Sequence, residues 1–194
     1  MKQLKPGEGW VEVVVGCMFS GKTEELLRRL RRAQYAKQTV IAVKPVIDDR
    51  YHVEKLATHT GQTLEAIPIR DVADLMEKIG DACVVGIDEA QFIKGIADAV
   101  QDLANEGRRV IVAGLDMDYQ GIPFGPIPEL LATAEKVSKL SAVCMVCGAS
   151  ATRSQRIVDS EEQVVIGATG VYEARCRKHW NPKPIFSQWS EAEG

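Results

Sequence analysis

The chain has 194 residues, of which 45% are hydrophobic and 26% charged, with a formal net charge of −3. That length suggests one main domain and a small appendage, with enough apolar residues for a packed core. Nucleic acid is not an expected partner because such binding needs a basic surface. A membrane is not expected either, because no apolar stretch approaches the ~20 residues that span a bilayer.

Strand-like and helix-like segments alternate through the first two thirds of the chain. Short apolar runs predict buried strands at residues 11–16, 39–44, 82–87 and 109–115. Leucines on one helical face predict a helix at residues 21–36, and similar patterns predict helices at 71–79 and 93–106. Residues 48–63 are polar without a clear period and predict a long loop. The alternation predicts an α/β fold, with a parallel sheet and helices on both faces.

The alternation stops near Leu140, where we place a domain boundary. Short strand-like pieces follow at residues 155–158 and 163–166. We therefore expect a main domain over residues 1–140 and a small second domain over residues 141–194. The segment from about Pro182 onward is expected to form a flexible tail.

Residues 16–23 match the phosphate-binding template G-x4-G-K-[ST]. A predicted strand precedes this segment and a predicted helix follows it, which is the context the template requires. The glycines let backbone N–H groups turn toward a phosphate, and the helix N-terminus adds its positive dipole end. Lys22 is then expected to reach the β- and γ-phosphates, and the hydroxyl of Thr23 to bind Mg²⁺.

Two carboxylates, Asp88 and Glu89, end one of the apolar strands. The carboxyl edge of an α/β sheet is where such folds place their ligands. Asp88 suits the Mg²⁺ side of a nucleotide site, and Glu89 is free to take a proton from an acceptor hydroxyl. The same pair also fits an ATPase in which the glutamate activates water, so the residue pattern leaves kinase and ATPase open.

Two C-x2-[CH] pairs bracket the predicted second domain: Cys144 with Cys147, and Cys176 with His179. Three thiolates and one imidazole close a tetrahedral zinc site and leave no open position for chemistry. The zinc ion is therefore predicted to be structural. The first residues do not form a secretory signal, so we expect a cytoplasmic protein whose cysteines are reduced or bind metal.

Three other features are expected to be structural. The arginines at positions 28, 29, 31 and 32 have helical spacing and are expected to form a solvated face. Cys17 and Cys83 are expected to be packing residues rather than metal ligands.

In combination, these segments resemble the zinc-containing, type II thymidine kinases. The resemblance covers most of the chain, and the segments that carry it read GCMFSGKT, KPVIDDRY, THTG, IDEAQF, GLDMDYQGIPFGP and VVIGATGVYEARCRKH. It implies a P-loop kinase domain with a zinc-bound lasso domain. It also implies transfer of the γ-phosphate of ATP to the 5′-hydroxyl of thymidine or deoxyuridine, a homotetramer, and feedback inhibition by dTTP.

The resemblance assigns roles residue by residue. It implies that Glu89 is the catalytic base and that Lys22 and Arg50 stabilise the transferred phosphoryl group. It places ATP and Mg²⁺ against Gly16, Met18, Phe19, Ser20, Gly21, Lys22, Thr23, Asp48, Asp88 and Gln91. It places the nucleoside against Met18, Phe92, Leu115, Tyr119, Phe124, Val165, Ile166, Gly167 and Tyr172.

The sequence departs from the family pattern at three positions. Cys17 stands where a small residue or proline is more frequent, and Tyr119 stands where many members have phenylalanine. His179 replaces a cysteine that some members use, and either residue binds zinc. Only Tyr119 bears on substrate preference, because it adds a hydroxyl to the predicted base pocket.

Two other kinds of protein remain as alternatives. One is a P-loop ATPase whose zinc module binds a macromolecule, which predicts a basic or aromatic surface on that module. The other is a zinc-ribbon interaction protein with a degenerate nucleotide site, which predicts a damaged P-loop or a missing acidic residue, whereas Lys22, Thr23, Asp88 and Glu89 are all present. The intact P-loop and the mixed charges of the second domain favour the kinase.

Overall fold

Six parallel strands form the main sheet, in the spatial order β5-β2-β6-β7-β1-β8. The computed structural model describes residues 8–46, 55–57, 63–158, 160 and 170–182. The strands of the sheet are β1 (Trp10–Val15), β2 (Val40–Pro45), β5 (Ile67–Ile69), β6 (Val84–Ile87), β7 (Arg109–Gly114) and β8 (Lys136–Lys139). The four predicted strands are therefore confirmed, and they are the four central strands of this sheet.

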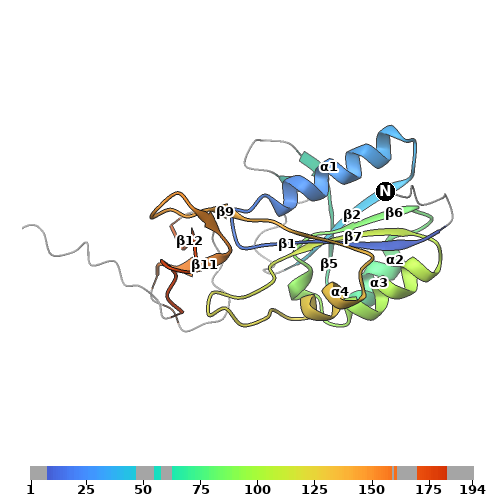
Figure 1. Cartoon of the computed structure of the whole chain (residues 1–194). Helices are drawn as coiled ribbons and strands as arrows, with labels where there is room; N and C mark the ends of the chain where they lie inside the picture. The colour runs from blue at the N-terminus through green and yellow to red at the C-terminus, as the bar shows by residue number, and fades with distance from the viewer. Residues whose placement is uncertain (1–7, 47–54, 58–62, 159, 161–169, 183–194) are drawn as a thin grey trace, which may run out of the picture.

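Helices cover both faces of the sheet, as the alternation predicts (Figure 1). Helix α1 (Lys22–Tyr35) packs leucines such as Leu26 and Leu30 against one face. The helices α2 (Val72–Lys78), α3 (Ile96–Asn105) and α4 (Ile127–Thr133) cover the other face. The strands β1, β6 and β7 are buried on both faces, which explains why they read as nearly continuous apolar runs.

Several elements were not predicted from the sequence. The strands β5 and β8 and the helix α4 are short or carry charged residues, so their periodicity is weak. The prediction of a loop over residues 48–63 is wrong in part, because β3 (Lys55–Ala57) pairs antiparallel with β4 (Thr63–Glu65). The predicted helix at 93–106 begins later, at Ile96, after a 3₁₀ turn (Ala90–Phe92) and a left-handed Gly95.

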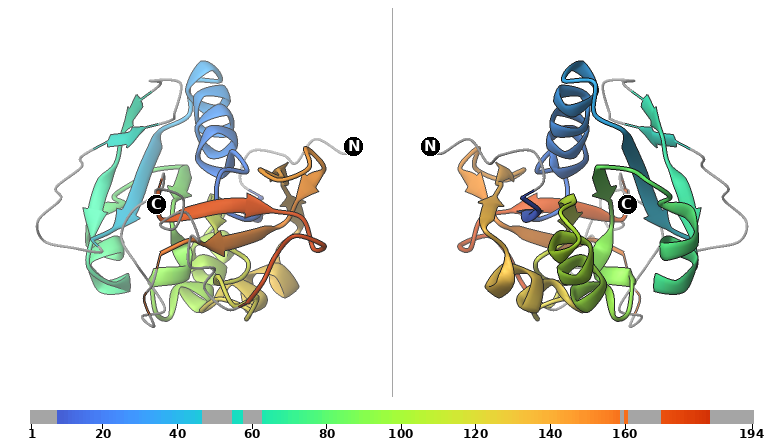
Figure 2. Two further views of the ribbon diagram at one scale, coloured as in Figure 1. Left: turned by 90° about the vertical axis from the view of Figure 1, so that its left-hand side faces the viewer. Right: turned by 90° about the vertical axis from the view of Figure 1, so that its right-hand side faces the viewer.

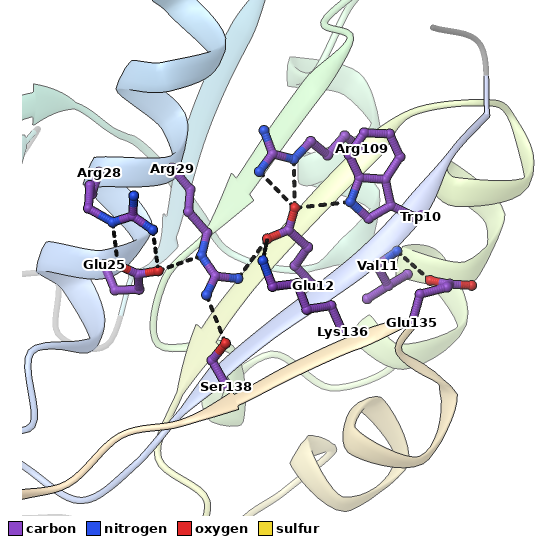
Figure 3. A network of polar contacts seen from close by, with 10 residues as sticks. All are labelled: Trp10, Val11, Glu12, Glu25, Arg28, Arg29, Arg109, Glu135, Lys136 and Ser138. Carbon is purple, nitrogen blue, oxygen red and sulfur yellow. Dashed lines mark hydrogen bonds and ion pairs between the residues drawn. The ribbon is translucent and has the colours of Figure 1, made fainter. Parts of the chain in front are cut away.

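A buried ion network joins β1, β7, β8 and α1 (Figure 3). Its centre is Glu12, which binds Arg29 at 2.6 Å and Arg109 at 2.7 Å and accepts a hydrogen bond from the Trp10 indole. Burial opposes ionisation of Glu12, but the Trp10 and arginine contacts hold its pKa below the usual value. The expected solvated face is therefore wrong for Arg29, which is buried, whereas Arg28 is exposed.

The strands β9–β12 lie beyond the carboxyl end of the main sheet (Figure 1). There β9 (Ala142–Val143) pairs with β10 (Ser150–Ala151), and β11 (Arg153–Arg156) pairs with β12 (Tyr172–Arg175). Seen from that end, β11 and β12 cross the edge of the sheet between α1 and the opposite helix layer (Figure 2, left). The strand predicted at 155–158 corresponds to β11, two residues earlier. The strand predicted at 163–166 and the predicted tail lie outside the described residues.

In the part of the chain that the structure describes, no helix has the length and apolar character to cross a bilayer.

Candidate active site and metal centre

The turn between β1 and α1 has the geometry of a phosphate-binding loop. Gly16 has φ +153°, and an added Cβ would lie 2.6 Å from the carbonyl oxygen of Leu140. Gly21 caps α1 with φ +82°, a left-handed conformation that favours glycine. Ser20 Oγ is buried and has no hydrogen-bond partner among the described residues. An unsatisfied hydroxyl at a helix N-terminus is suited to an anionic ligand.

Lys22 and Thr23 begin α1 and point to different partners. The Lys22 ammonium donates a hydrogen bond to the carbonyl oxygen of Cys17, 2.9 Å away, so it folds back over the loop. The Thr23 hydroxyl donates to Asp88 Oδ2 at 2.9 Å. The hydroxyl oxygen of Thr23 and a carboxylate oxygen of Asp88 therefore lie side by side next to the loop. Oxygen atoms of this kind are the ligands that Mg²⁺ prefers when it binds with a nucleotide.

Asp88 and Glu89 follow β6 at the carboxyl edge of the sheet. Asp88 is buried, and burial together with the charge of Glu89 raises the pKa of Asp88 to about 7. Glu89 is half-buried and has a left-handed backbone, with φ +52°. For a non-glycine residue this conformation is uncommon and strained, and such residues gather at functional sites.

Gln91 is hydrogen-bonded to the Glu89 carboxylate. Its amide nitrogen donates a hydrogen bond to Glu89 Oε2, and its amide oxygen accepts one from the backbone N–H of Leu115 at 3.0 Å. An added Cβ on Gly114 would lie 2.7 Å from the same amide oxygen. Gln91, which we expected against the nucleotide, is thus buried between Glu89 and the loop after β7.

The aromatic residues predicted to surround the base lie in two groups. Phe92 and Phe124 make an edge-to-face contact, with ring centroids 5.4 Å apart. Tyr119 and Tyr172 are both buried, and the Arg156 guanidinium lies between them. The loop that contains Tyr119 is ordered by Asp118, whose carboxylate accepts hydrogen bonds from two backbone N–H groups of the same loop.

The strands β10 and β11 contact the phosphate-binding loop directly. The Cys17 thiol is buried and donates to the carbonyl oxygen of Ala151 at 3.3 Å, and the Met18 N–H donates to Ser154 Oγ at 3.1 Å. Cys17 is therefore a packing residue, as predicted. Cys83 lies outside the cysteine–histidine cluster, as predicted, but it is exposed just before β6 begins, so its predicted packing role is wrong.

Sequence reasoning missed three residues at this boundary: Ser154, Arg156 and Trp180. The indole N–H of Trp180 donates to the carbonyl oxygen of Tyr119 at 3.1 Å, and its ring contacts Gly121. None of the three belongs to a short motif with a known spacing. The one available signal was the position of Trp180 directly after the predicted ligand His179.

The four predicted metal ligands form one cluster. The ligand atoms of Cys144, Cys147, Cys176 and His179 all lie within 4.8 Å of one another. The sulfurs of Cys147 and Cys176 are 3.8 Å apart, which matches the ~3.8 Å expected for two thiolates bound at ~2.3 Å around a tetrahedral zinc ion. Burial opposes the thiolate of Cys144, but backbone N–H groups outweigh it and lower its pKa to about 5. The cluster thus has the donor set and the spacing of a four-ligand zinc site.

Five predicted site residues lie outside the described part of the chain. They are Asp48 and Arg50, expected near the transferred phosphate, and Val165, Ile166 and Gly167, expected near the base.

The parallel sheet, the glycine-rich turn before α1 and the acidic end of β6 together define a P-loop NTPase-like domain. A flagellar accessory protein, FlaH from Methanocaldococcus jannaschii, has a similar fold, with a TM-score of 0.51 and 11% identity over 74% of this chain and 75% of that one. At that identity the similarity concerns the fold alone.

The sequence itself defines the family. A family profile described as thymidine kinase matches residues 9–180, which is most of the chain. The chain belongs to the thymidine kinase family and is a kinase that acts on small nucleoside and nucleotide substrates.

Proposed function

We propose that this protein transfers the γ-phosphate of ATP to the 5′-hydroxyl of thymidine or deoxyuridine, with Glu89 as the general base. The observation that carries the proposal is the position of Glu89. Its half-buried carboxylate follows β6 directly after Asp88, which is hydrogen-bonded to Thr23 of the phosphate-binding loop. A base in that position has the transferred phosphoryl group and an acceptor hydroxyl within the same site.

The reaction exchanges one P–O bond for another. Glu89 takes the proton of the 5′-hydroxyl as that oxygen forms its bond to the γ-phosphorus. The bond from the γ-phosphorus to the β–γ bridging oxygen breaks, and ADP leaves with that electron pair. Lys22 and Arg50 offset the negative charge on the phosphoryl oxygens, as cationic side chains do in this chemistry.

Two metal ions belong to the proposal. The oxygens of Thr23 and Asp88 would hold the Mg²⁺ ion of the ATP complex, which would supply charge neutralisation at the phosphates. Zn²⁺ would be held by the cluster of three cysteines and His179, where it has a structural role. Its role here is to keep β9–β12 folded against the loop that binds ATP.

The nucleoside is proposed to bind between the two groups of aromatic residues. Phe92 and Phe124 form one apolar wall, and Tyr119 and Tyr172 form another. Flat apolar walls favour a planar pyrimidine. Gln91 supports the site by holding Glu89 and the N–H of Leu115.

Three further properties are proposed on the family resemblance. They are inhibition by dTTP, a homotetrameric assembly and a cytoplasmic location. A deoxynucleoside triphosphate combines the base of one substrate with the phosphates of the other, so it fits a site that accepts both.

The test is an assay of the purified protein with ATP and Mg²⁺, with and without each nucleoside. We expect ADP release to depend on thymidine and to be accompanied by dTMP. ADP release at the same rate with and without thymidine would identify an ATPase and reject the kinase proposal. Uridine and deoxycytidine serve as matched controls for the sugar and the base.

A further inference from the structure

Arg156 is a fully buried arginine in a protein module with a small core. It lies on β11, opposite Tyr172 of β12 in the register of the hairpin, and its exposed fraction is 0%. Burying a guanidinium is costly unless its N–H groups are hydrogen-bonded and its charge is compensated. Its contacts should therefore reveal what the residue does.

Those contacts join two residues from distant parts of the chain. The guanidinium carbon lies 3.7 Å from the centroid of the Tyr119 ring, in the loop after β7. Arg156 Nη2 donates a hydrogen bond to the Tyr172 hydroxyl at 2.7 Å, and Nη1 donates to the carbonyl oxygen of Ser160 at 3.1 Å. One planar group thus touches the main domain through Tyr119 and the second domain through Tyr172.

Arginine suits this arrangement better than any other side chain. The guanidinium is flat, so it can stack on an aromatic ring while its N–H groups donate hydrogen bonds within its own plane. Lysine has a single ammonium group, which cannot cover the Tyr119 ring and hold the Tyr172 hydroxyl in the same geometry. The separation of the two tyrosines therefore depends on the shape of Arg156 as well as on its charge.

Two alternate positions on β11 contact different parts of the proposed site. Ser154, two residues before Arg156 and on the same face of the strand, binds the Met18 N–H of the phosphate-binding loop. Arg156 binds the two tyrosines instead. One face of a short strand thus contacts the phosphate side of the site at one position and the nucleoside side at the next.

We propose that Arg156 is a positioning residue for the nucleoside, which sets the distance and orientation of Tyr119 relative to Tyr172. This inference rests on the proposed function, in which these two tyrosines border the base and the sugar. Arg156 acts through the tyrosines, so it controls nucleoside affinity and leaves the ATP side of the site unchanged.

The test compares Arg156→Lys and Arg156→Met with the wild type in steady-state assays with thymidine and ATP. Losing a hydrogen bond from a charged group and the ring contact corresponds to roughly 10- to 100-fold in affinity. We expect the KM for thymidine to rise about tenfold in the lysine variant and more in the methionine variant. The KM for ATP should change less than about twofold, and kcat at saturating thymidine less than about threefold.

The matched control is Arg175→Lys, at an arginine of β12 that pairs with Glu173 of the same strand. It changes the same kind of side chain in the same hairpin, and its KM for thymidine should match the wild type. A double-mutant cycle with Tyr172→Phe isolates the hydrogen bond: Tyr172→Phe should raise the KM for thymidine in the wild type and add little in the Arg156→Met background.

The possible results distinguish the positioning role of Arg156 from the proposed thymidine kinase activity. A wild type that does not phosphorylate thymidine rejects both. If the wild type is active, an unchanged KM for thymidine in Arg156→Lys, or equal increases in both KM values, overturns the positioning role alone. Melting temperature and zinc content are measured for each variant. If Arg156→Met does not fold, the lysine variant decides the result.

Discussion

At the scale of single residues, Asp88 and Glu89 are adjacent carboxylates with different surroundings. Asp88 is buried and bonded to Thr23, whereas Glu89 is half-buried and held by Gln91. Burial and the neighbouring charge of Glu89 raise the pKa of Asp88 to about 7. Their different surroundings fit the proposed division of roles, with Asp88 beside the phosphate-binding loop and Glu89 beside the acceptor hydroxyl.

Glu89→Gln tests the general base. The amide keeps the shape of the side chain but cannot take a proton, so turnover should fall by roughly 10²- to 10⁴-fold. ATP affinity, measured by equilibrium titration, should stay close to that of the wild type. Glu106→Gln, at an exposed glutamate at the end of α3, is the control. Wild-type turnover in Glu89→Gln would reject Glu89 as the base.

Asp88→Asn tests the raised pKa through stability. Because the folded-state pKa of Asp88 is about 7 and the unfolded value about 4, folding opposes ionisation of this group. The protonated Asp88 therefore makes its full contribution to the free energy of unfolding below about pH 4, and this contribution is lost as the pH rises toward 7. Asparagine does not titrate and can still accept the Thr23 hydrogen bond.

The measurement is the free energy of unfolding of both proteins, without nucleotide or Mg²⁺, at pH 4.5 and pH 8. The advantage of the asparagine variant should grow between these two values by an amount on the order of 2–4 kcal/mol. A pH-independent difference between the two proteins would show that Asp88 titrates at its ordinary value.

At the scale of elements, α1 is held to the sheet by both apolar and ionic contacts. Leu26, Leu27 and Leu30 are buried against the strands, and Arg29 reaches from the same helix to Glu12 in the middle of β1. Arg29 also binds Glu25 at 2.8 Å and the Ser138 hydroxyl of β8 at 2.9 Å. One side chain therefore connects the helix, a central strand and an edge strand (Figure 3).

Arg29→Met should weaken this connection without a large change in side-chain volume. Glu12 would keep Arg109 as a partner, so we expect a loss of roughly 1–3 kcal/mol in the free energy of unfolding, measured by denaturant titration. Arg28→Met is the matched control, because Arg28 is exposed and its ion pair among the described residues is with Glu25, so its loss should be less than about 1 kcal/mol. Equal losses in the two variants would contradict the role assigned to the buried network.

At the scale of the whole molecule, the strands β9–β12 have a small apolar core of their own. This core includes Cys17 from the phosphate-binding loop, alongside Ala142, Cys144, Ala151 and Ala174. The main domain has two larger clusters, one on each face of its sheet. The strands β9–β12 therefore need a further source of stability, which the proposed zinc ion would supply.

Cys176→Ser should remove zinc and release these strands from the active site. Elemental analysis should show loss of the metal. Thymidine turnover should fall by at least about tenfold, because substitutions around metal sites typically lower activity by that factor or more. The main domain should still unfold cooperatively, because its clusters lie outside the zinc module. Cys83→Ser, at an exposed thiol outside the cluster, should keep its zinc. Full zinc content in Cys176→Ser would contradict the ligand assignment.

Local sequence was sufficient for features whose cause is local. The glycines of the phosphate-binding loop, the apolar runs of the central strands and the spacing of the cysteine pairs each follow from chemistry within a few residues. The edge strand β8 and the helix α4 were missed because partial exposure leaves them without a strong period. The hairpin β3–β4 was missed because each strand has only three residues.

The sequence by itself determined the class of fold, the phosphate-binding loop, the acidic pair and the four residues of the cysteine–histidine cluster. Only the tertiary structure decided that Arg29 is buried, that Gln91 holds Glu89, and that Arg156 joins Tyr119 to Tyr172. The physical reason is the range of the contacts. A motif is encoded by neighbours along the chain, whereas a buried arginine is defined by partners brought together from distant segments when the chain folds.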